Sequence, residues 1–450
     1  MKSKAISGSL MFVRSGWLFG YFLFVGSLSL LSLNLEIHDF AEIAAIFLGL
    51  TVLIYFLIKT SVNDSFPTIP ELVLLLFLVP GTINLSFSTE LRVLKTTIGI
   101  DLNGIRLILF CIAAAIIIIS WGKVEKVFVI FFVFLAVGAA SLCYTPDLLE
   151  GFRFFLKLLV PYFVYVLSKQ VSHQSLERIN RGFLLVVFLH MPFVFETLFK
   201  WLKQFDPSRD IPRAMGLSGG RVILGTFMVF AFVLFSYRRS LSRDGHGWIY
   251  LAFSVMAVFA IILSGARIAW VALAIAALLL GLLKNIKVLA LIGMILLILI
   301  ILFQPLLEHR LGLEIKDGKI GMKGAGGGTA EHRFTTWKVL WERDISPNLL
   351  LGNGLGSSKK LLSFTNMDYP HNEYIRILLE LGVVGFALFC FAFLYLSVFL
   401  LRKTKNLKIL IPISVFLVLS LAGNTLNNYF ENAAICAYLL AYIERTSEER

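Results

Sequence analysis

The sequence predicts an all-α fold, a polytopic bundle of transmembrane helices, and three observations support this prediction. Of the 450 residues, 58% are hydrophobic, and the mean hydropathy of +0.85 is far too high for a soluble protein. The apolar runs at 105–121, 248–264 and 288–303 are each about long enough to cross a bilayer. These runs are continuously apolar instead of alternating, so they predict helices and not the strands of a barrel.

We expect 12–14 spans, with both termini on the cytoplasmic side. Two candidate spans are weaker than the others, because a proline and an asparagine interrupt 70–86, and Lys157 and Pro161 interrupt 154–168. Removing both leaves 12 spans and does not change the predicted side of anything from residue 182 onward. The candidate spans are 17–33, 42–58, 70–86, 105–121, 127–144, 154–168, 182–198, 222–237, 248–264, 268–283, 288–303, 373–401, 409–422 and 432–443.

Basic residues in short loops predict the orientation of the bundle. Arg238, Arg239 and Arg243 lie between two spans, and a second basic cluster at 402–408 lies between two others. The predicted outer loop at 423–431 contains no Lys or Arg. The formal net charge of +13 is spread over such loops, so we interpret it as a determinant of topology and of contact with anionic lipids, not as a nucleic-acid-binding surface.

The whole chain, 1–450, is predicted to be one integral membrane domain from which two external loops project. The shorter loop is 199–221. The longer loop, 304–372, precedes the third-last span. Within it, Glu331–Arg343 carries apolar residues along one side, which predicts a helix on the membrane surface, next to a glycine-rich hinge at 324–328. We expect the two loops to form the active site.

The most informative motif is a His-Asn pair, His371 and Asn372, separated by nine residues from Gly382 and by two more from Gly385. His371 ends the longest external loop, at the level of the lipid head groups, where a side chain that titrates near neutrality suits a general base. Alternatively, His371 is an interfacial side chain and Asn372 is the N-cap of the next span. The two glycines by themselves indicate close helix contact.

Two arginines at predicted external span ends are candidates for binding an anion. Arg267 follows Ser264-Gly265-Ala266 in a turn too short to be a real loop, and Arg221 opens the span at 222–237. A guanidinium group binds a diphosphate in a planar, bidentate manner that a lysine does not reproduce. The alternative for both arginines is an interfacial anchor that reaches the lipid phosphates.

Two other patterns, a glycine-rich loop and the acidic residues of the spans, do not predict a cofactor or metal site. Gly352–Gly356 superficially resembles a dinucleotide-binding loop, but it lacks the strand–turn–helix context and the spacing of the third glycine. Asp and Glu are sparse in the spans, with Glu196 and Glu380 the notable cases, and no carboxylate cluster offers a metal site.

The spacing His-Asn-x9-Gly-x-x-Gly resembles the signature of the O-antigen ligase and O-antigen polymerase family of bacterial membrane glycosyltransferases. The resemblance covers about 215–390. It includes the turns at Arg221 and at Ser264–Trp270, and the section from Arg333 through Trp337 to Gly352–Gly356. The N-terminal half is similar to the family only in hydropathy.

The resemblance implies transfer of a glycan from undecaprenyl diphosphate to an acceptor hydroxyl, on the periplasmic face of the bacterial inner membrane, with no metal, nucleotide or other cofactor. His371 would accept the proton of the attacking hydroxyl, and Arg267 and Arg221 would stabilise the diphosphate leaving group. These three are the predicted catalytic residues. The predicted substrate-binding residues are Arg213, Arg333, Asn372, Tyr374 and Trp337.

The predicted enzyme is an O-antigen ligase with lipid A–core as acceptor, and the alternative is a polymerase of the same family that extends a second carrier-linked glycan. The complete motif and the net-basic outer loops favour the ligase, since the acceptor is acidic. A lipid-linked glycan flippase or transporter would predict repeated halves and charged residues at mid-membrane, which are not evident. A membrane sensor would more often carry a soluble domain.

Overall fold

The structure is a computed structural model that describes 68–81, 102–121, 128–203, 214–218, 220–242, 247–284, 313–316, 319–322, 329–363, 369–423, 425–426 and 430–449. Nearly all of these residues are helical. The helices are α3 (Ile69–Gly81), α5 (Leu102–Trp121), α6 (Val129–Ser141), α7 (Leu148–Gln170), α8 (His173–Lys203), α9 (Arg221–Leu241), α10 (Gly247–Ser264), α11 (Arg267–Lys284), α14 (Thr329–Leu340), α15 (Ser358–Leu361), α16 (Glu373–Thr404), α17 (Leu410–Ser420) and α18 (Phe430–Glu448).

Shorter elements join these helices. Two 3₁₀ turns, η2 and η4, cover Gly216–Ser218 and Leu407–Ile409, and a π-helical turn, η3, covers Trp341–Ile345. An antiparallel hairpin is formed by β1 (Leu313–Lys316) and β2 (Lys319–Met322). The sequence analysis did not predict this hairpin in the long loop, although the bundle itself is all-α as predicted.

Among the described residues, five helices are long and apolar enough to cross a membrane: α7, the part of α8 at His173–Trp201, α9, α10 and α16. This confirms the predicted polytopic helical membrane fold. The number of spans remains a prediction, because the candidates at 17–33, 42–58 and 288–303 lie outside the described residues.

The predicted weak span at 154–168 is a continuous helix, α7, with Lys157 and Pro161 inside it. Two boundaries in the predicted external loops shift. The loop predicted from residue 199 begins later, because α8 continues to Lys203. The helix predicted over Glu331–Arg343 is α14, which ends at Leu340 and passes into η3.

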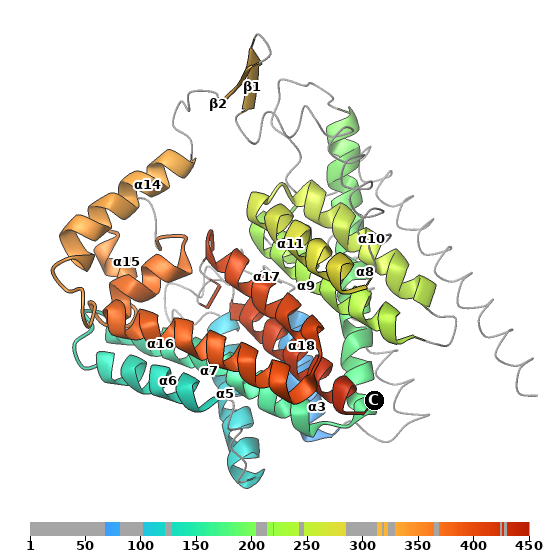
Figure 1. Cartoon of the computed structure of the whole chain (residues 1–450), viewed down its shortest axis with the longest axis horizontal. Helices are drawn as coiled ribbons and strands as arrows, with labels where there is room; N and C mark the ends of the chain where they lie inside the picture. The colour runs from blue at the N-terminus through green and yellow to red at the C-terminus, as the bar shows by residue number, and fades with distance from the viewer. Residues whose placement is uncertain are drawn as a thin grey trace, which may run out of the picture.

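Figure 1 shows α17 and α18 between two groups of helices, α6, α7 and α16 on one side and α8 to α11 on the other. Their packing agrees with this view, since α17 contacts α11, α9 and α16, and α18 contacts α7 and α9. The two central helices therefore link the motif-bearing α16 to the helices that begin with Arg221 and Arg267.

One end of the bundle is closed by charged hydrogen bonds around Glu444 of α18, and we call it the Glu444 end. The Glu444 carboxylate is fully buried and accepts hydrogen bonds from Lys169 Nζ (2.7 Å), Lys403 Nζ (2.6 Å) and the Tyr165 hydroxyl. At the same end, Arg238 Nη1 donates to the Tyr442 hydroxyl at 2.7 Å and Arg238 Nη2 donates to the Tyr250 hydroxyl at 3.0 Å.

At the opposite end, the N-termini of α9, α11, α16 and α18 gather, and we call it the His371 end. A Cβ added at Gly225 of α9 would lie 3.1 Å from Ala266 Cβ, so α9 packs directly on the turn before α11. Asn432 of α18 donates to Thr226 of α9 at 3.0 Å. The backbone N–H of Leu426, just before α18, donates to Glu373 of α16 at 3.1 Å. These contacts form one continuous chain across the four helix N-termini.

Candidate functional site

Helix α16, which follows His371 and Asn372, is folded back on itself at Gly382. Gly382 has φ 63° and ψ −167°, which interrupts the helix. The Tyr374 ring lies 6.4 Å from the Phe386 ring and 6.1 Å from the Phe389 ring, centroid to centroid. In one straight helix Tyr374 and Phe389 would be about 22 Å apart. Residues 373–381, the folded-back segment, therefore lie along the part of α16 that follows them.

Both glycines of the motif are explained by this reversal. A left-handed φ at Gly382 favours glycine, and a Cβ there would also lie 2.7 Å from the backbone nitrogen of Gly352. A Cβ at Gly385 would overlap the Leu381 side chain, at the end of the folded-back segment. Gly385 thus makes a close contact within α16, whereas Gly382 makes one with the loop at 350–352. The nine residues of the motif spacing are the folded-back segment itself.

The loop Gly352–Gly356 fixes the reversal from outside. Its three glycines have φ values of 72°, 88° and 81°, and a Cβ at Gly354 would lie 2.6 Å from Thr145 Cα. Thr145 Oγ1 donates to the Leu355 carbonyl at 2.7 Å, and the Val383 N–H donates to the Leu349 carbonyl at 2.8 Å. The glycines of this loop therefore allow close packing. The loop packs against Thr145, between α6 and α7, and against the reversal of α16 at Gly382.

The Tyr144 hydroxyl adds a further bond to this loop, donating to the Leu351 carbonyl at 2.8 Å. Desolvation by partial burial raises the pKa of Tyr144.

His371 lies directly before the folded-back segment in a strained conformation. It is half-buried and has φ 53°, a left-handed value that costs about 1–2 kcal/mol for a residue with a Cβ. On its N-terminal side, the carbonyl of Pro370 accepts a hydrogen bond from Trp337 Nε1 at 2.7 Å. On its C-terminal side, Asn372 Oδ1 accepts the N–H groups of Tyr374 (3.0 Å) and Ile375 (3.1 Å). The chain holds this conformation from both sides.

Three predicted substrate-binding residues have bonds within the protein. Asn372 is the N-cap of α16, as its alternative interpretation proposed. The Tyr374 hydroxyl donates to the Leu417 carbonyl of α17 at 2.7 Å. The indole N–H of Trp337, the side chain's single donor, is bonded to Pro370. In the folded protein these polar atoms are hydrogen-bonded to the backbone.

A buried charged cluster that the sequence analysis did not assemble supports the folded-back segment. Glu373, Arg376 and Glu380 are each fully buried, and their spacing puts them on one face of a helix. Glu373 accepts hydrogen bonds from Arg376, including one from Nε at 3.1 Å. The Arg376 guanidinium carbon lies 3.5 Å from the centroid of the Phe154 ring on α7, and Glu380 accepts a 2.6 Å bond from the Ser358 hydroxyl.

The cluster is incompletely bonded. Arg376 Nη1 and Glu380 Oε2 are 4.0 Å apart, and neither atom has a hydrogen-bond partner among the described residues. A buried charge stabilises a structure only when its partner is well placed, so we expect this cluster to add little to stability. The available signal was the spacing of the three charges in a stretch otherwise interpreted as a span.

The two predicted catalytic arginines are the first residues of their helices. Arg221 begins α9 and is half-buried, and Arg267 begins α11 and is exposed. Arg221 precedes Gly225 by about 6 Å of helix rise, and Gly225 packs on Ala266, which adjoins Arg267. Both arginines therefore lie at the His371 end, where helix N-termini also favour anions.

The other two predicted basic residues are less informative. Arg333 is half-buried on α14, which also carries Trp337. Arg213 lies outside the described residues. Among the residues that the structure does describe, no group of three or more His, Cys, Asp or Glu side chains could hold a metal ion.

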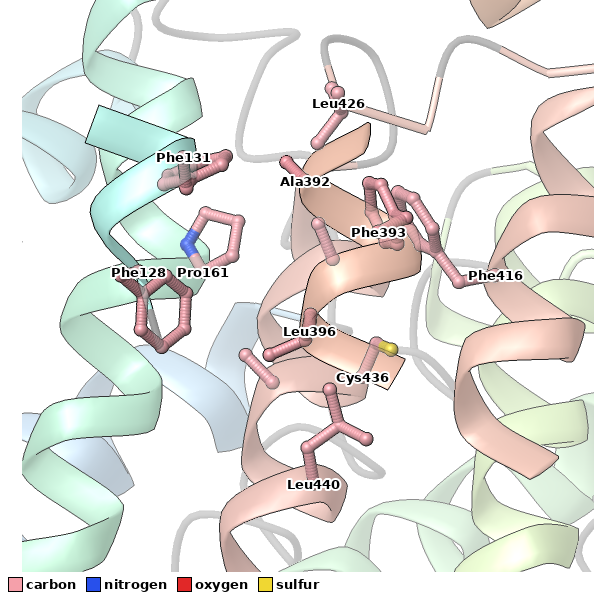
Figure 2. A pocket seen from close by; sticks show the side chains of 12 residues that line it. Phe128, Phe131, Pro161, Ala392, Phe393, Leu396, Phe416, Leu426, Cys436 and Leu440 are labelled. Atoms are coloured by element: carbon pink, nitrogen blue, oxygen red, sulfur yellow. The ribbon is translucent and has the colours of Figure 1, made fainter. Parts of the chain in front are cut away.

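A partly open apolar pocket lies between α6 and α7 on one side and α16, α17 and α18 on the other (Figure 2). Phe128, Phe131 and Pro161 line one wall, and Phe393 and Phe416 lie on the opposite wall. It is also lined by Leu426, whose N–H bonds to Glu373 of the folded-back segment. Leu426 therefore links the lining of this pocket to the folded-back segment.

The comparison with known protein families agrees with the motif. Residues 252–390 match the family model described as O-Antigen ligase. The matched stretch contains Arg267, Trp337, His371 and the complete reversal of α16, whereas Arg221 precedes it. The resemblance predicted from the His371–Gly385 spacing is thereby confirmed over these residues. The search of curated proteins found no match to the chain.

Proposed function

We propose that this membrane protein, whose residues 252–390 belong to the O-antigen ligase family, transfers a glycan from undecaprenyl diphosphate to an acceptor hydroxyl on the periplasmic face of the bacterial inner membrane. The observation that carries the proposal is the conformation of His371. A histidine is held in a costly left-handed conformation at the end of the bundle where Arg221 and Arg267 also lie. Strain of this kind is typical of functional sites.

In the proposed reaction, His371 is the general base. Its imidazole accepts the proton of the acceptor hydroxyl as the oxygen attacks the anomeric carbon of the donor glycan. The bond between that carbon and the diphosphate oxygen breaks, and the bonding electron pair leaves with the undecaprenyl diphosphate. Imidazole titrates near neutrality, so it is available as a neutral base at physiological pH.

Arg221 and Arg267 are proposed to bind the diphosphate. Negative charge grows on the leaving group in the transition state, and guanidinium groups fixed at that position stabilise it without rearrangement. The N–H groups of the first turns of α9 and α11 point in the same direction and add to this stabilisation.

The apolar pocket is the proposed location of part of the undecaprenyl chain. Its lining is aromatic and aliphatic, as an isoprenoid requires, and Leu426 links this lining to the folded-back segment. A donor analogue with a diazirine on its isoprenoid chain should crosslink to α16 or α18 peptides that contain Leu396 or Leu440. Labelling confined to α10 and α11 would place the chain elsewhere.

The proposed acceptor is lipid A–core, because the net-basic outer loops suit an acidic acceptor, and the alternative is a second carrier-linked glycan. The test is purified protein in nanodiscs with undecaprenyl-diphosphate-linked glycan and both acceptors offered separately. Transfer to lipid A–core identifies a ligase, and elongation of the carrier-linked glycan identifies a polymerase. Donor movement between leaflets with no transfer to either acceptor would identify a transporter and reject the proposal.

A further inference from the structure

A hydrogen bond joins α14 to Pro370, the residue before the proposed base His371. Trp337 of α14 donates its indole N–H to the carbonyl of Pro370 at 2.7 Å. That carbonyl oxygen lies in the same rigid peptide plane as the nitrogen and Cα of His371. Rotation of this plane about the N–Cα bond of His371 is the φ angle of His371. The indole hydrogen bond therefore acts directly on the strained torsion.

The indole is itself fixed in place. The Phe334 ring meets the Trp337 ring edge to face, with centroids 5.1 Å apart. On the same helix Leu340 is fully buried and packs in a small cluster with Leu362 and Leu379. Leu379 belongs to the folded-back segment, so α14 packs on this segment and also bonds to Pro370, just before it.

From this geometry we infer that Trp337 is a positioning residue, which holds the peptide plane of Pro370 and His371 so that the imidazole points at the acceptor. This inference rests on the proposed role of His371 as the base. It differs from the sequence-based prediction that Trp337 binds substrate, because the indole has one donor and that donor is bonded to the chain.

The test is Trp337→Phe, which keeps an aromatic ring and removes the N–H. The matched control is Trp341→Phe, since Trp341 lies in the following π-helical turn and is 49% exposed. We expect the kcat of Trp337→Phe to fall about tenfold, as for loss of one hydrogen bond, with the KM for donor and acceptor unchanged. The control should retain both constants.

A double-mutant cycle separates positioning from a general structural effect. In the His371→Ala background, adding Trp337→Phe should cause no further loss of transfer, because both changes act through the same imidazole. Two kinetic outcomes would overturn the inference. One is a higher KM at unchanged kcat, which means that the ring contacts substrate. The other is the same tenfold loss in the His371→Ala background.

A second readout does not depend on transfer, so it remains decisive if the proposed function fails. Amide hydrogens of residues 371–375 should exchange faster in Trp337→Phe than in wild type or in Trp341→Phe. Unchanged exchange there would reject the inference. If Trp337→Phe does not fold, benzothienylalanine at position 337 preserves the ring shape and replaces the N–H by sulfur, and the same expectations apply to it.

Discussion

The two ends of the helix bundle each bury a glutamate, but the two carboxylates differ in how completely they are hydrogen-bonded. At the Glu444 end, the carboxylate of Glu444 accepts bonds from two lysines and a tyrosine. At the His371 end, one oxygen of Glu380 lacks a hydrogen-bond partner among the described residues and lies 4.0 Å from Arg376 Nη1. The first arrangement clamps helices together. The second holds a reversed helix and a strained histidine in one arrangement, as expected where function and stability compete.

The two ends also offer a comparison of backbone strain. Among the described residues, His371 and Lys405 are the non-glycine residues with a positive φ, 53° and 51°. Lys405 is the C-cap of α16, at the Glu444 end, where a left-handed residue is an ordinary way to end a helix. His371 precedes a helix instead of ending one. A left-handed φ therefore ends a helix at Lys405, whereas at His371 it sets the conformation of the proposed base.

The largest expected difference between the ends is in catalysis. His371→Ala should lower transfer by on the order of 10²–10⁴-fold, the contribution of a positioned general base, while donor binding is retained because the arginines bind the diphosphate. Lys405→Ala should leave transfer unchanged. The measurements are transfer and donor binding by purified protein, with and without EDTA. Loss of donor binding in His371→Ala would make His371 a ligand of the diphosphate instead of the base.

For stability, substitutions at the Glu444 end should have larger effects than substitutions at the His371 end. Glu444→Gln removes the charge shared by Lys169 and Lys403 and should lower the free energy of unfolding by about 3 kcal/mol, the low end for breaking a buried ion pair, because Lys403 is partly exposed. Glu380→Gln should cost about 1 kcal/mol, because Ser358 can still donate to the amide oxygen. Denaturant titration in detergent measures both. A larger cost for Glu380→Gln would contradict the comparison.

Arginine geometry provides a third contrast. Arg267→Lys should lower transfer by about 10–100-fold, nearly as much as Arg267→Ala, because an ammonium group does not form the two parallel bonds of a guanidinium to a diphosphate. The control is Arg239→Lys, an exposed arginine at the Glu444 end. It should behave as wild type. Normal turnover in Arg267→Lys would reduce Arg267 to an interfacial anchor.

The smallest expected effect concerns the strained torsions themselves. His371→Gly and Lys405→Gly should each raise the free energy of unfolding by about 0.5–1 kcal/mol, because glycine adopts the left-handed region without strain and this gain exceeds its greater freedom in the unfolded chain. Thermal unfolding of both variants measures the effect. Of the two, His371→Gly alone should lose transfer. A stability loss in His371→Gly would mean that the imidazole contributes more to folding than its torsion costs.

The sequence predicted the helical membrane fold and the position of the motif, because both depend on local composition and spacing. It did not predict the reversal of α16. Residues 373–401 were interpreted as one span, and the role of Gly382 depends on the loop at 350–352, which packs against it. Contacts such as Arg376 on Phe154 or Trp337 with Pro370 join residues far apart in the chain, so no local pattern reports them.

The hairpin of β1 and β2 was missed for a different reason. The chain from 313 to 322 reads LEIKDGKIGM, and an Asp-Gly pair between two short alternating runs is a recognised hairpin signal. The pairing of Lys316 with Lys319 is the register expected around such a pair. Here the signal was local and present, but the glycine content of the surrounding loop was interpreted as a hinge alone.

The nine residues between Asn372 and Gly382 set both the distance and the rotation between His371 and the glycine turn. Each residue of an α-helix turns the next by about 100° and advances it by about 1.5 Å. One inserted residue between 373 and 381 would rotate His371 by that angle relative to the glycine turn, and would move it away from α14 even though every motif residue was still present. Chains with the same motif residues but eight or ten residues between the Asn and the first Gly should therefore lack this geometry. The length of the segment is then as diagnostic of the site as the histidine before it.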